Sequence, residues 1–150
     1  MKIIAANNRA NYNFTISNKI EAGIVLTGSE VKSLRTNTGS IRGSYIIEQN
    51  GELWLSNSFI KKYQNSNDTN YDPNRRRKLL VTKKELHKIL GASKKVGMTI
   101  VPMILYFNAK GLAKLTIGLA KGKKKQDKRN SIKDKEWSIK QQRIVKNRLI

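Results

Sequence analysis

Four adjacent cations form the most concentrated chemical feature of the sequence: Arg75, Arg76, Arg77 and Lys78. Like charges at this spacing repel one another unless an anion lies among them, and guanidinium groups bind phosphate well. The run directly follows residues 64–74, which are rich in Asn, Asp and Ser and predict an exposed loop. We therefore interpret the four side chains as phosphate-binding residues, with a solvated rim as the alternative.

Catalytic and metal chemistry have little support in the sequence. There is no cysteine and a single histidine, His87, which excludes a thiol nucleophile, a Cys-based zinc site and a histidine cluster. Residues 118–124 imitate a phosphate-binding loop but lack the Ser or Thr that would hold magnesium. Asp68 and Asp72 could bind a cation, although acids in such a loop more often serve as turn residues. We expect no catalytic residue, no metal site and no cofactor.

Three other side chains are candidates for recognition. Glu21 lies in a strand-like segment near basic residues, where it is either a salt-bridge partner or an acceptor of hydrogen bonds from RNA bases or 2′-hydroxyls. Trp54 alternates with leucines, which favours packing over base stacking. Trp137 lies in a basic segment with no core of its own to join, so a partner surface is its expected destination.

Charge points to the class of partner. The 150 residues contain 31 Lys and Arg against 10 Asp and Glu, which gives a net charge of +21. Nucleic acid and anionic membranes both attract such a charge. No apolar run approaches the roughly 18 residues of a membrane span, and residues 3–6 are too short for a signal-peptide core. We expect a monomeric, cytoplasmic protein that binds nucleic acid and no membrane.

The first 120 residues predict one compact, strand-rich domain. β-Branched residues and period-two alternation indicate strands over residues 12–16, 20–28, 41–49, 52–57, 79–81, 99–107 and 112–120. Asn50-Gly51 suits the positive φ angles of a tight hairpin turn, and residues 108–111 predict a second hairpin. Pro102 indicates an edge position or a bulge, because proline lacks an amide hydrogen.

Two short helices are expected between these strands. Ser29 is the expected N-cap of a helix over residues 29–35, and Thr82 with Glu85 forms a capping box that begins another, which Gly91 should end. Such a mainly β chain with short helices favours a closed antiparallel OB-like barrel, because closure removes exposed edges. An SH3-like barrel and a split α+β sandwich remain alternatives.

Residues 121–150 have the character of a flexible basic tail. They hold twelve Lys or Arg and three acids, a net charge of +9. Their apolar residues scatter around a helical wheel and form no single packing face. We therefore expect a domain over residues 1–120 and a tail that is disordered when free.

Several segments, in order, resemble the SsrA-binding protein (SmpB) family. They are Glu21-Ala22-Gly23-Ile24-Val25-Leu26-Thr27-Gly28, Glu30-Val31-Lys32-Ser33-Leu34-Arg35, Asp72-Pro73 before Arg77-Lys78-Leu79-Leu80, and Ala120-Lys121-Gly122-Lys123-Lys124 before Asp127-Lys128-Arg129. Each segment alone is weak, but their order and spacing together are specific.

The resemblance implies a bacterial OB-fold protein without catalytic activity. It implies that the chain binds transfer-messenger RNA (SsrA RNA) and delivers it to stalled 70S ribosomes for trans-translation, ribosome rescue and tagging of incomplete peptides. By the same resemblance, Asn7, Glu21, Leu80 and Lys114 match positions on the RNA-contacting surface.

The resemblance also assigns a role to the tail. The family's tail enters the small-subunit decoding region and the empty messenger channel and becomes helical there. Lys123, Lys124, Asp127, Lys128, Arg129 and Trp137 are the residues expected to engage the ribosome. Gln126 stands where relatives place a histidine.

Two other functions are compatible with the residues alone. A ribosomal or general RNA-binding barrel would show no preference for transfer-messenger RNA. A metal-free nuclease would hydrolyse bare RNA through an acid such as Glu21.

Overall fold

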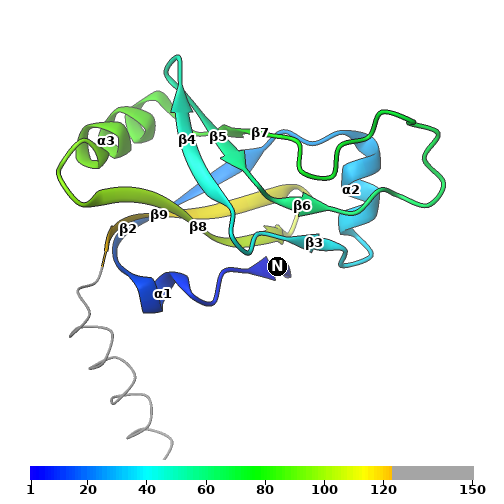
Figure 1. The fold of residues 1–150 in the computed structure, drawn as a ribbon, viewed down its shortest axis with the longest axis horizontal. Helices are drawn as coiled ribbons and strands as arrows, with labels where there is room; N and C mark the ends of the chain where they lie inside the picture. Colours follow the sequence, from blue (N-terminus) through cyan, green and yellow to red (C-terminus); the bar gives the residue numbers. More distant parts are fainter. Residues whose placement is uncertain (123–150) are drawn as a thin grey trace, which may run out of the picture.

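The computed structural model describes residues 1–122 (Figure 1). The predictions for Lys123, Lys124, Asp127, Lys128, Arg129 and Trp137 lie outside the described residues. Within residues 1–122 the fold is mainly β with short helices, as the sequence predicted.

A seven-stranded antiparallel sheet forms the body of the fold, in the order β1-β8-β9-β2-β7-β5-β4. Its strands are β1 Lys2–Ala6, β2 Phe14–Ile24, β4 Tyr45–Gln49, β5 Glu52–Ser56, β7 Arg77–Leu80, β8 Met98–Phe107 and β9 Ala113–Gly122. A separate two-stranded ribbon pairs β3, Gly39–Ser40, with β6, Phe59–Ile60.

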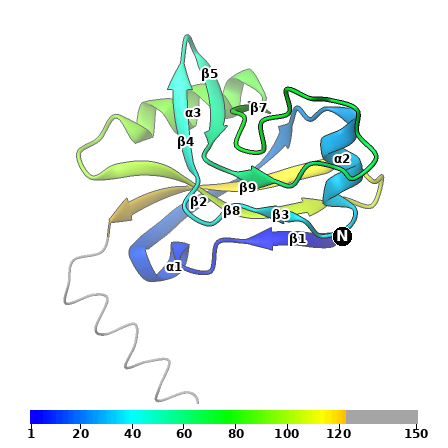
Figure 2. The same ribbon diagram turned by 45° about the vertical axis from the view of Figure 1, so that its right-hand side comes forward.

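The sheet curls without closing. Its edge strands β1 and β4 are not hydrogen-bonded to each other, although β4 approaches β8 across the fold. Strand β3 lies next to β1, where a closing strand would have to pair (Figure 2). The expected closed barrel is therefore not found in the described part of the chain, and the OB-like assignment stays a prediction.

Both predicted hairpins are confirmed. Strands β4 and β5 flank Asn50 and Gly51, whose φ angles are 55° and 75°, in the left-handed region that this turn requires. Strands β8 and β9 pair along their length, with a register shift between Pro102 and Ile104. The bulge expected at Pro102 is present, while the edge position is not, since β8 lies between β1 and β9.

The N-terminal strand prediction needs correction. Residues 12–16 and 20–28 were expected to form two strands, but β2 runs unbroken through Phe14–Ile24 and absorbs the polar Ser17-Asn18 step as a bulge against β9. Residues 10–13 form helix α1, Ala10–Asn13, and β1 was not foreseen. Strand β1 exists because β8 pairs with it, a contact made about a hundred residues away in sequence.

The two expected helices are present with shifted ends. Helix α2, Gly28–Leu34, is capped by Thr27 and not by Ser29. The Thr27 hydroxyl accepts a hydrogen bond from the Glu30 backbone amide, and the Thr27 backbone amide donates one to the Glu30 carboxylate, which completes a capping box. Helix α3, Lys83–Ser93, begins after Thr82 as predicted. It continues through Gly91, which was expected to end it.

The apolar core lies on the inner face of the curled sheet. Helices α2 and α3 close its two ends, so that Leu34 from α2 and Ile89 from α3 join the core cluster (Figure 1). A smaller cluster under α1 contains Ala10, Val101, Met103 and Ala120. Strand β9 extends through Lys121 and Gly122, which the sequence had assigned to the tail.

Candidate nucleic-acid interface

Three strands bring Leu80, Gly23 and Lys114 side by side on the outer face of the sheet. Gly23 of β2 lies opposite Leu80 of β7 on one side and Lys114 of β9 on the other. The residue beside each of them on its own strand is buried in the core: Ala22 beside Gly23, Leu79 beside Leu80, and Leu115 beside Lys114. Since side chains alternate across a strand, Leu80 and Lys114 must face outward.

Leu80 is an apolar side chain held in the open. It is 51% exposed, although its strand neighbour Leu79 is 3% exposed. A Cβ atom on Gly23 would lie 3.3 Å from the Cβ of Leu80, so the glycine gives the leucine room to lie across β2. A groove of about 370 Å³ opens beside them, lined mainly by Leu26, Val31, Arg35, Leu112 and Lys114.

Glu21 extends the same face. It lies opposite Thr116 of β9, while Lys114 lies opposite Tyr106 of β8. Burial raises the pKa of Tyr106, and its hydrogen bond to the Glu21 carboxylate raises it further. The Tyr106 hydroxyl therefore stays protonated beside Glu21, whose side chain is exposed to solvent.

The outer face continues over β7 and β5. Lys78 lies opposite Trp54, and its Nζ is 3.1 Å from the Glu52 carboxylate. The Arg76 guanidinium lies 5.5 Å from the centre of the Trp54 ring and donates a 2.6 Å hydrogen bond to Gln49 Oε1. Trp54 therefore packs on the outer surface under an arginine, while its neighbours Leu53 and Leu55 supply the core.

Arg77 departs from the sequence interpretation, because it is completely buried. Its Nε donates to Glu30 Oε2 at 2.7 Å, Nη1 donates to Ser58 Oγ at 2.8 Å, and Nη2 donates to the Pro73 carbonyl at 3.1 Å. The guanidinium is thus fully engaged inside the protein. Arg77 ties the loop before β7 to Glu30 of α2 and to Ser58, which lies just before β6. Its assignment as a phosphate contact is corrected to a structural one.

Glu30 holds two of the four predicted cations. Arg75 Nη2 lies 2.6 Å from Glu30 Oε1, and Arg77 Nη2 lies 2.6 Å from Glu30 Oε2. Burial alone would raise the pKa of Glu30, but hydrogen bonds from Arg75, the Thr27 amide and Arg77, together with the Arg77 charge, lower it overall. The carboxylate is therefore ionised in the fold. Arg75 keeps 40% of its side chain exposed, whereas Arg77 keeps none.

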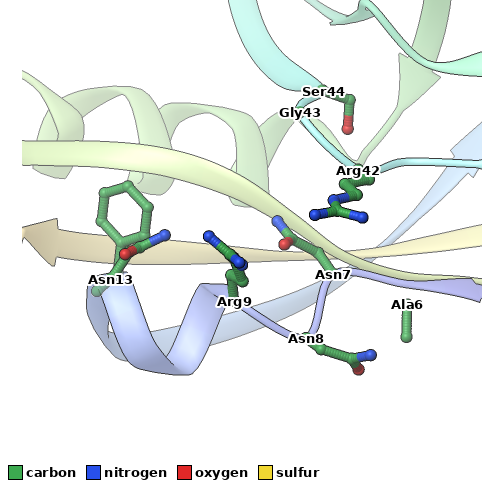
Figure 3. A pocket seen from close by; sticks show the side chains of 9 residues that line it. Ala6, Asn7, Asn8, Arg9, Asn13, Arg42, Gly43 and Ser44 are labelled. Carbon is green, nitrogen blue, oxygen red and sulfur yellow. The ribbon is translucent and has the colours of Figure 1, made fainter.

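Asn7 lies apart from this face. Its side-chain Nδ2 donates a 3.1 Å hydrogen bond to the Pro102 carbonyl, and its backbone amide donates a 2.8 Å hydrogen bond to the Met103 carbonyl. It lines a different pocket, of about 600 Å³, together with Arg9 and Arg42 (Figure 3). The structure thus brings together Glu21, Leu80, Lys114, Lys78 and Arg76, but not Asn7.

Sequence reasoning missed several members of these surfaces. Tyr106 lies in an almost continuous apolar run, which hides its outward orientation until the bulge at residues 102–104 is known. Arg9 and Arg42 are isolated cations in the sequence, and they come to line one pocket only because the fold places the start of α1 and the segment before β4 around the same cavity.

The described residues give little support for other kinds of site. Within residues 1–122, no group of three or more His, Asp or Glu side chains is arranged to hold a metal ion. No helix in the same part of the chain is long and apolar enough to cross a membrane.

Comparison with known proteins identifies relatives over nearly the whole chain. Residues 4–147 match the model of the "SmpB protein" family. An SsrA-binding protein of Bartonella tribocorum is 50% identical over 145 residues, covering 97% of this chain and 92% of the relative. An SsrA-binding protein of Wolbachia pipientis is 46% identical, covering 99% of this chain and 100% of the relative.

A solved structure agrees with these matches. A chain from "tmRNA-SmpB: a journey to the center of the bacterial ribosome" superimposes with a TM-score of 0.66 at 42% identity, covering 85% of this chain and 92% of that one. Sequence and fold therefore agree on one conclusion: this chain belongs to the SmpB protein family.

Proposed function

We propose that this protein binds transfer-messenger RNA and delivers it to stalled ribosomes for trans-translation. The observation that carries the proposal is the convergence of Glu21, Leu80 and Lys114 on one outer face, at positions that match the family's RNA-contacting surface. The relatives are SsrA-binding proteins, and the solved structure pairs SmpB with transfer-messenger RNA and the bacterial ribosome.

The chemistry of the face suits folded RNA better than a regular duplex. Leu80 offers an apolar contact for a splayed base or a ribose, and Lys114 offers a phosphate contact. Glu21 repels phosphate, so it contributes by accepting hydrogen bonds from base edges or 2′-hydroxyls. A face that combines the three side chains can recognise bases and riboses as well as phosphate charge. This combination favours binding of a specific RNA over general RNA binding.

Trp54 and Arg76 extend this face toward the β4–β5 hairpin. An indole ring already covered by a guanidinium gives a flat cationic platform, on which a base can stack. Lys78 forms an exposed ion pair with Glu52 and adds a nearby cation. Arg75 is partly exposed and can contribute to phosphate binding while it remains bonded to Glu30.

The remaining assignments follow from this role. The protein acts in the cytoplasm as an adaptor and not as an enzyme, and its curled sheet is an opened relative of an OB barrel. Residues 123–150 engage the decoding region and messenger channel, through the cations, Asp127 and Trp137 named from the sequence.

Selective RNA capture tests the proposal. Immobilised full-length protein should retain transfer-messenger RNA from total bacterial RNA in preference to tRNA and ribosomal RNA. Leu80→Ala should lose most of this retention. Val96→Ala is the matched control, because Val96 is 99% exposed and distant from the outer face, and it should behave as wild type.

Two results would reject the proposal. Equal retention of all RNAs by the wild-type protein would favour a general RNA-binding protein. Hydrolysis of bare RNA that Glu21→Gln abolishes would favour a nuclease.

A further inference from the structure

A small pocket lies on the outer face near the tip of the β4–β5 hairpin, which projects beyond the rest of the sheet (Figure 2). Its volume is about 260 Å³, and its lining residues are Gln49, Asn50, Glu52, Trp54 and Arg76. Glu52 and Trp54 lie two residues apart on β5 and so share the outer face. Gln49 lies opposite Glu52 across the hairpin. The pocket therefore combines an aromatic ring, a guanidinium group, a carboxylate and two side-chain amides.

The guanidinium and the indole together form a platform for stacking. The Arg76 guanidinium lies over the Trp54 ring, and its Nη2 is held there by the hydrogen bond to Gln49 Oε1. In residues 1–122, Arg76 makes no ion pair, so no carboxylate of this part of the chain neutralises its charge. A planar cation held over an indole stacks well with a nucleobase, and every base has a face that can stack. Stacking alone therefore gives affinity without a choice of base.

The carboxylate of Glu52 is the group that can choose a base. Its Oε1 lies 3.1 Å from Lys78 Nζ, and its Oε2 has no hydrogen-bond partner among residues 1–122. The Glu52 side chain keeps 43% of its surface exposed, and an exposed ion pair of this kind adds little stability. A carboxylate between Arg76 and Lys78 also repels the phosphates of a bound RNA. A contact with a group other than phosphate accounts for an acid at this position.

The chemistry of a carboxylate selects one of the four RNA bases. An ionised carboxylate accepts hydrogen bonds through both oxygens and donates none. The Watson–Crick edge of guanine carries two adjacent donors, the N1–H group and the N2 amino group, which can bond both oxygens at once. Adenine, cytosine and uracil each place an acceptor beside the donor on this edge, and that acceptor would face a carboxylate oxygen. A carboxylate that meets this edge therefore favours guanine.

The amide of Gln49 fits the same base. Its Oε1 is held by Arg76, and its Nε2 has no partner within the described part of the chain. Guanine O6 is an acceptor that lies next to N1, and Gln49 lies next to Glu52 across the hairpin. The Gln49 amide can thus donate to O6 while Glu52 accepts from N1 and N2.

We propose that this pocket binds an unpaired guanine of RNA, which stacks on Arg76 over Trp54 and bonds to the Glu52 carboxylate through N1 and N2. The charges of Arg76 and Lys78 add attraction for the phosphates on either side of the base. A free guanine nucleotide presents the same base edge. The choice of RNA rests on the proposed function, because that function brings RNA to the outer face on which this pocket lies.

Binding of short oligoribonucleotides to the full-length protein tests the pocket. Uridine heptamers that carry one central guanosine, adenosine or cytidine are titrated in enough salt to weaken attraction by charge alone. The indole N–H resonance of Trp54 reports on the pocket itself, and Trp54→Phe assigns this resonance, since the chain has two tryptophans. The guanosine heptamer should bind at least about fivefold more tightly than the others, the preference that one bidentate base contact provides.

Glu52→Gln separates base recognition from charge. It removes a negative charge, so the adenosine and cytidine heptamers should bind more tightly, while the guanosine heptamer loses its bidentate partner and the preference falls to within about twofold. Glu48→Gln is the matched control. It makes the same change of charge on the same hairpin, lies opposite the buried Leu53 and so on the other face, and keeps an oxygen for the Gly51 amide. It should retain the wild-type preference. Arg76→Met should weaken binding of every heptamer alike, because stacking does not depend on the base.

The source of the guanine is tested by competition. Free GMP at a concentration equal to that of the guanosine heptamer should not displace it, because a single nucleotide lacks the neighbouring phosphates. Displacement by GMP would assign the pocket to the free nucleotide and overturn the inference.

Two other results would also overturn it. The wild-type protein would bind all heptamers equally, or Glu52→Gln would keep the preference for guanosine. The two proposals fail separately. A protein that selects transfer-messenger RNA but shows no preference for guanosine refutes only the guanine pocket, whereas a preference for guanosine without selection of transfer-messenger RNA refutes only the proposed function.

Discussion

Replacing Arg77 by methionine tests whether this residue stabilises the fold, as its burial indicates, or binds phosphate, as the sequence predicted. Methionine is similar in length to arginine but cannot donate hydrogen bonds. The change leaves Glu30 Oε2, Ser58 Oγ and the Pro73 carbonyl without the donors at 2.7, 2.8 and 3.1 Å. It also leaves a buried carboxylate with only one of its two cationic partners.

The structure gives the expected size of the effect. Removing one member of a buried ion pair costs about 3–5 kcal/mol, since the remaining charge is left uncompensated. Arg75 continues to bind Glu30 Oε1 and so reduces the penalty. We therefore expect Arg77→Met to lower the free energy of unfolding by about 3 kcal/mol, a large part of the total stability of a small domain.

Urea unfolding followed by far-UV circular dichroism measures this loss. Arg76→Met is the matched control, because Arg76 is the neighbouring cation, lies exposed over Trp54 and should cost about 0.5–1 kcal/mol. A double-mutant cycle with Glu30→Gln should show strong coupling to Arg77 and none to Arg76. If Arg77→Met unfolds like the control but binds RNA less tightly, the buried role assigned to Arg77 is wrong.

Three further predictions concern pH, recognition and chain length. The fold lowers the pKa of Glu30, so its ionised carboxylate contributes its full stabilisation above pH 4.5, the ordinary pKa of a glutamate. This stabilisation should be lost as the pH falls below that value, and the acid unfolding curve of Glu30→Gln should lack the corresponding loss. Glu21→Ala should reduce the preference for transfer-messenger RNA over tRNA more than Lys114→Ala does, while Lys114→Ala should reduce the log–log salt slope by about 0.7–0.9; equal losses that depend only on salt would contradict this division. A fragment ending after Gly122 should fold and bind transfer-messenger RNA, whereas ending it at Ala120 removes the last β2–β9 pairs and should lower its thermal midpoint; identical midpoints would show that those pairs add no stability.

Features that depend on neighbouring residues could be predicted from the sequence. The Asn50-Gly51 turn needs only two residues that accept positive φ angles, and both adopt them. Thr82 begins α3 because its side chain caps the amide of Glu85, three residues later. The β8–β9 hairpin likewise follows from two apolar runs joined by a short turn. The family resemblance came from motif order, which requires no tertiary information.

Features that depend on distant residues could not be predicted. Strand β1 forms only because β8 lies beside it, and Asn7 is drawn away from the other matched residues by its bonds to β8. Glu21, Leu80 and Lys114 become neighbours only through the registers that β2 makes with β7 and β9.

The cation run shows most clearly where the sequence stops being sufficient. The sequence by itself determined that Arg76, Arg77 and Lys78 are adjacent charges and that the chain needs a polyanionic partner. Strand alternation then turns Arg76 and Lys78 outward and Arg77 inward. An inward arginine is tolerated only because Glu30, forty-seven residues earlier, is buried at the same place. Tertiary structure alone decided which charges lie on the outer face and which one holds the fold together, because only packing brings the compensating carboxylate to Arg77.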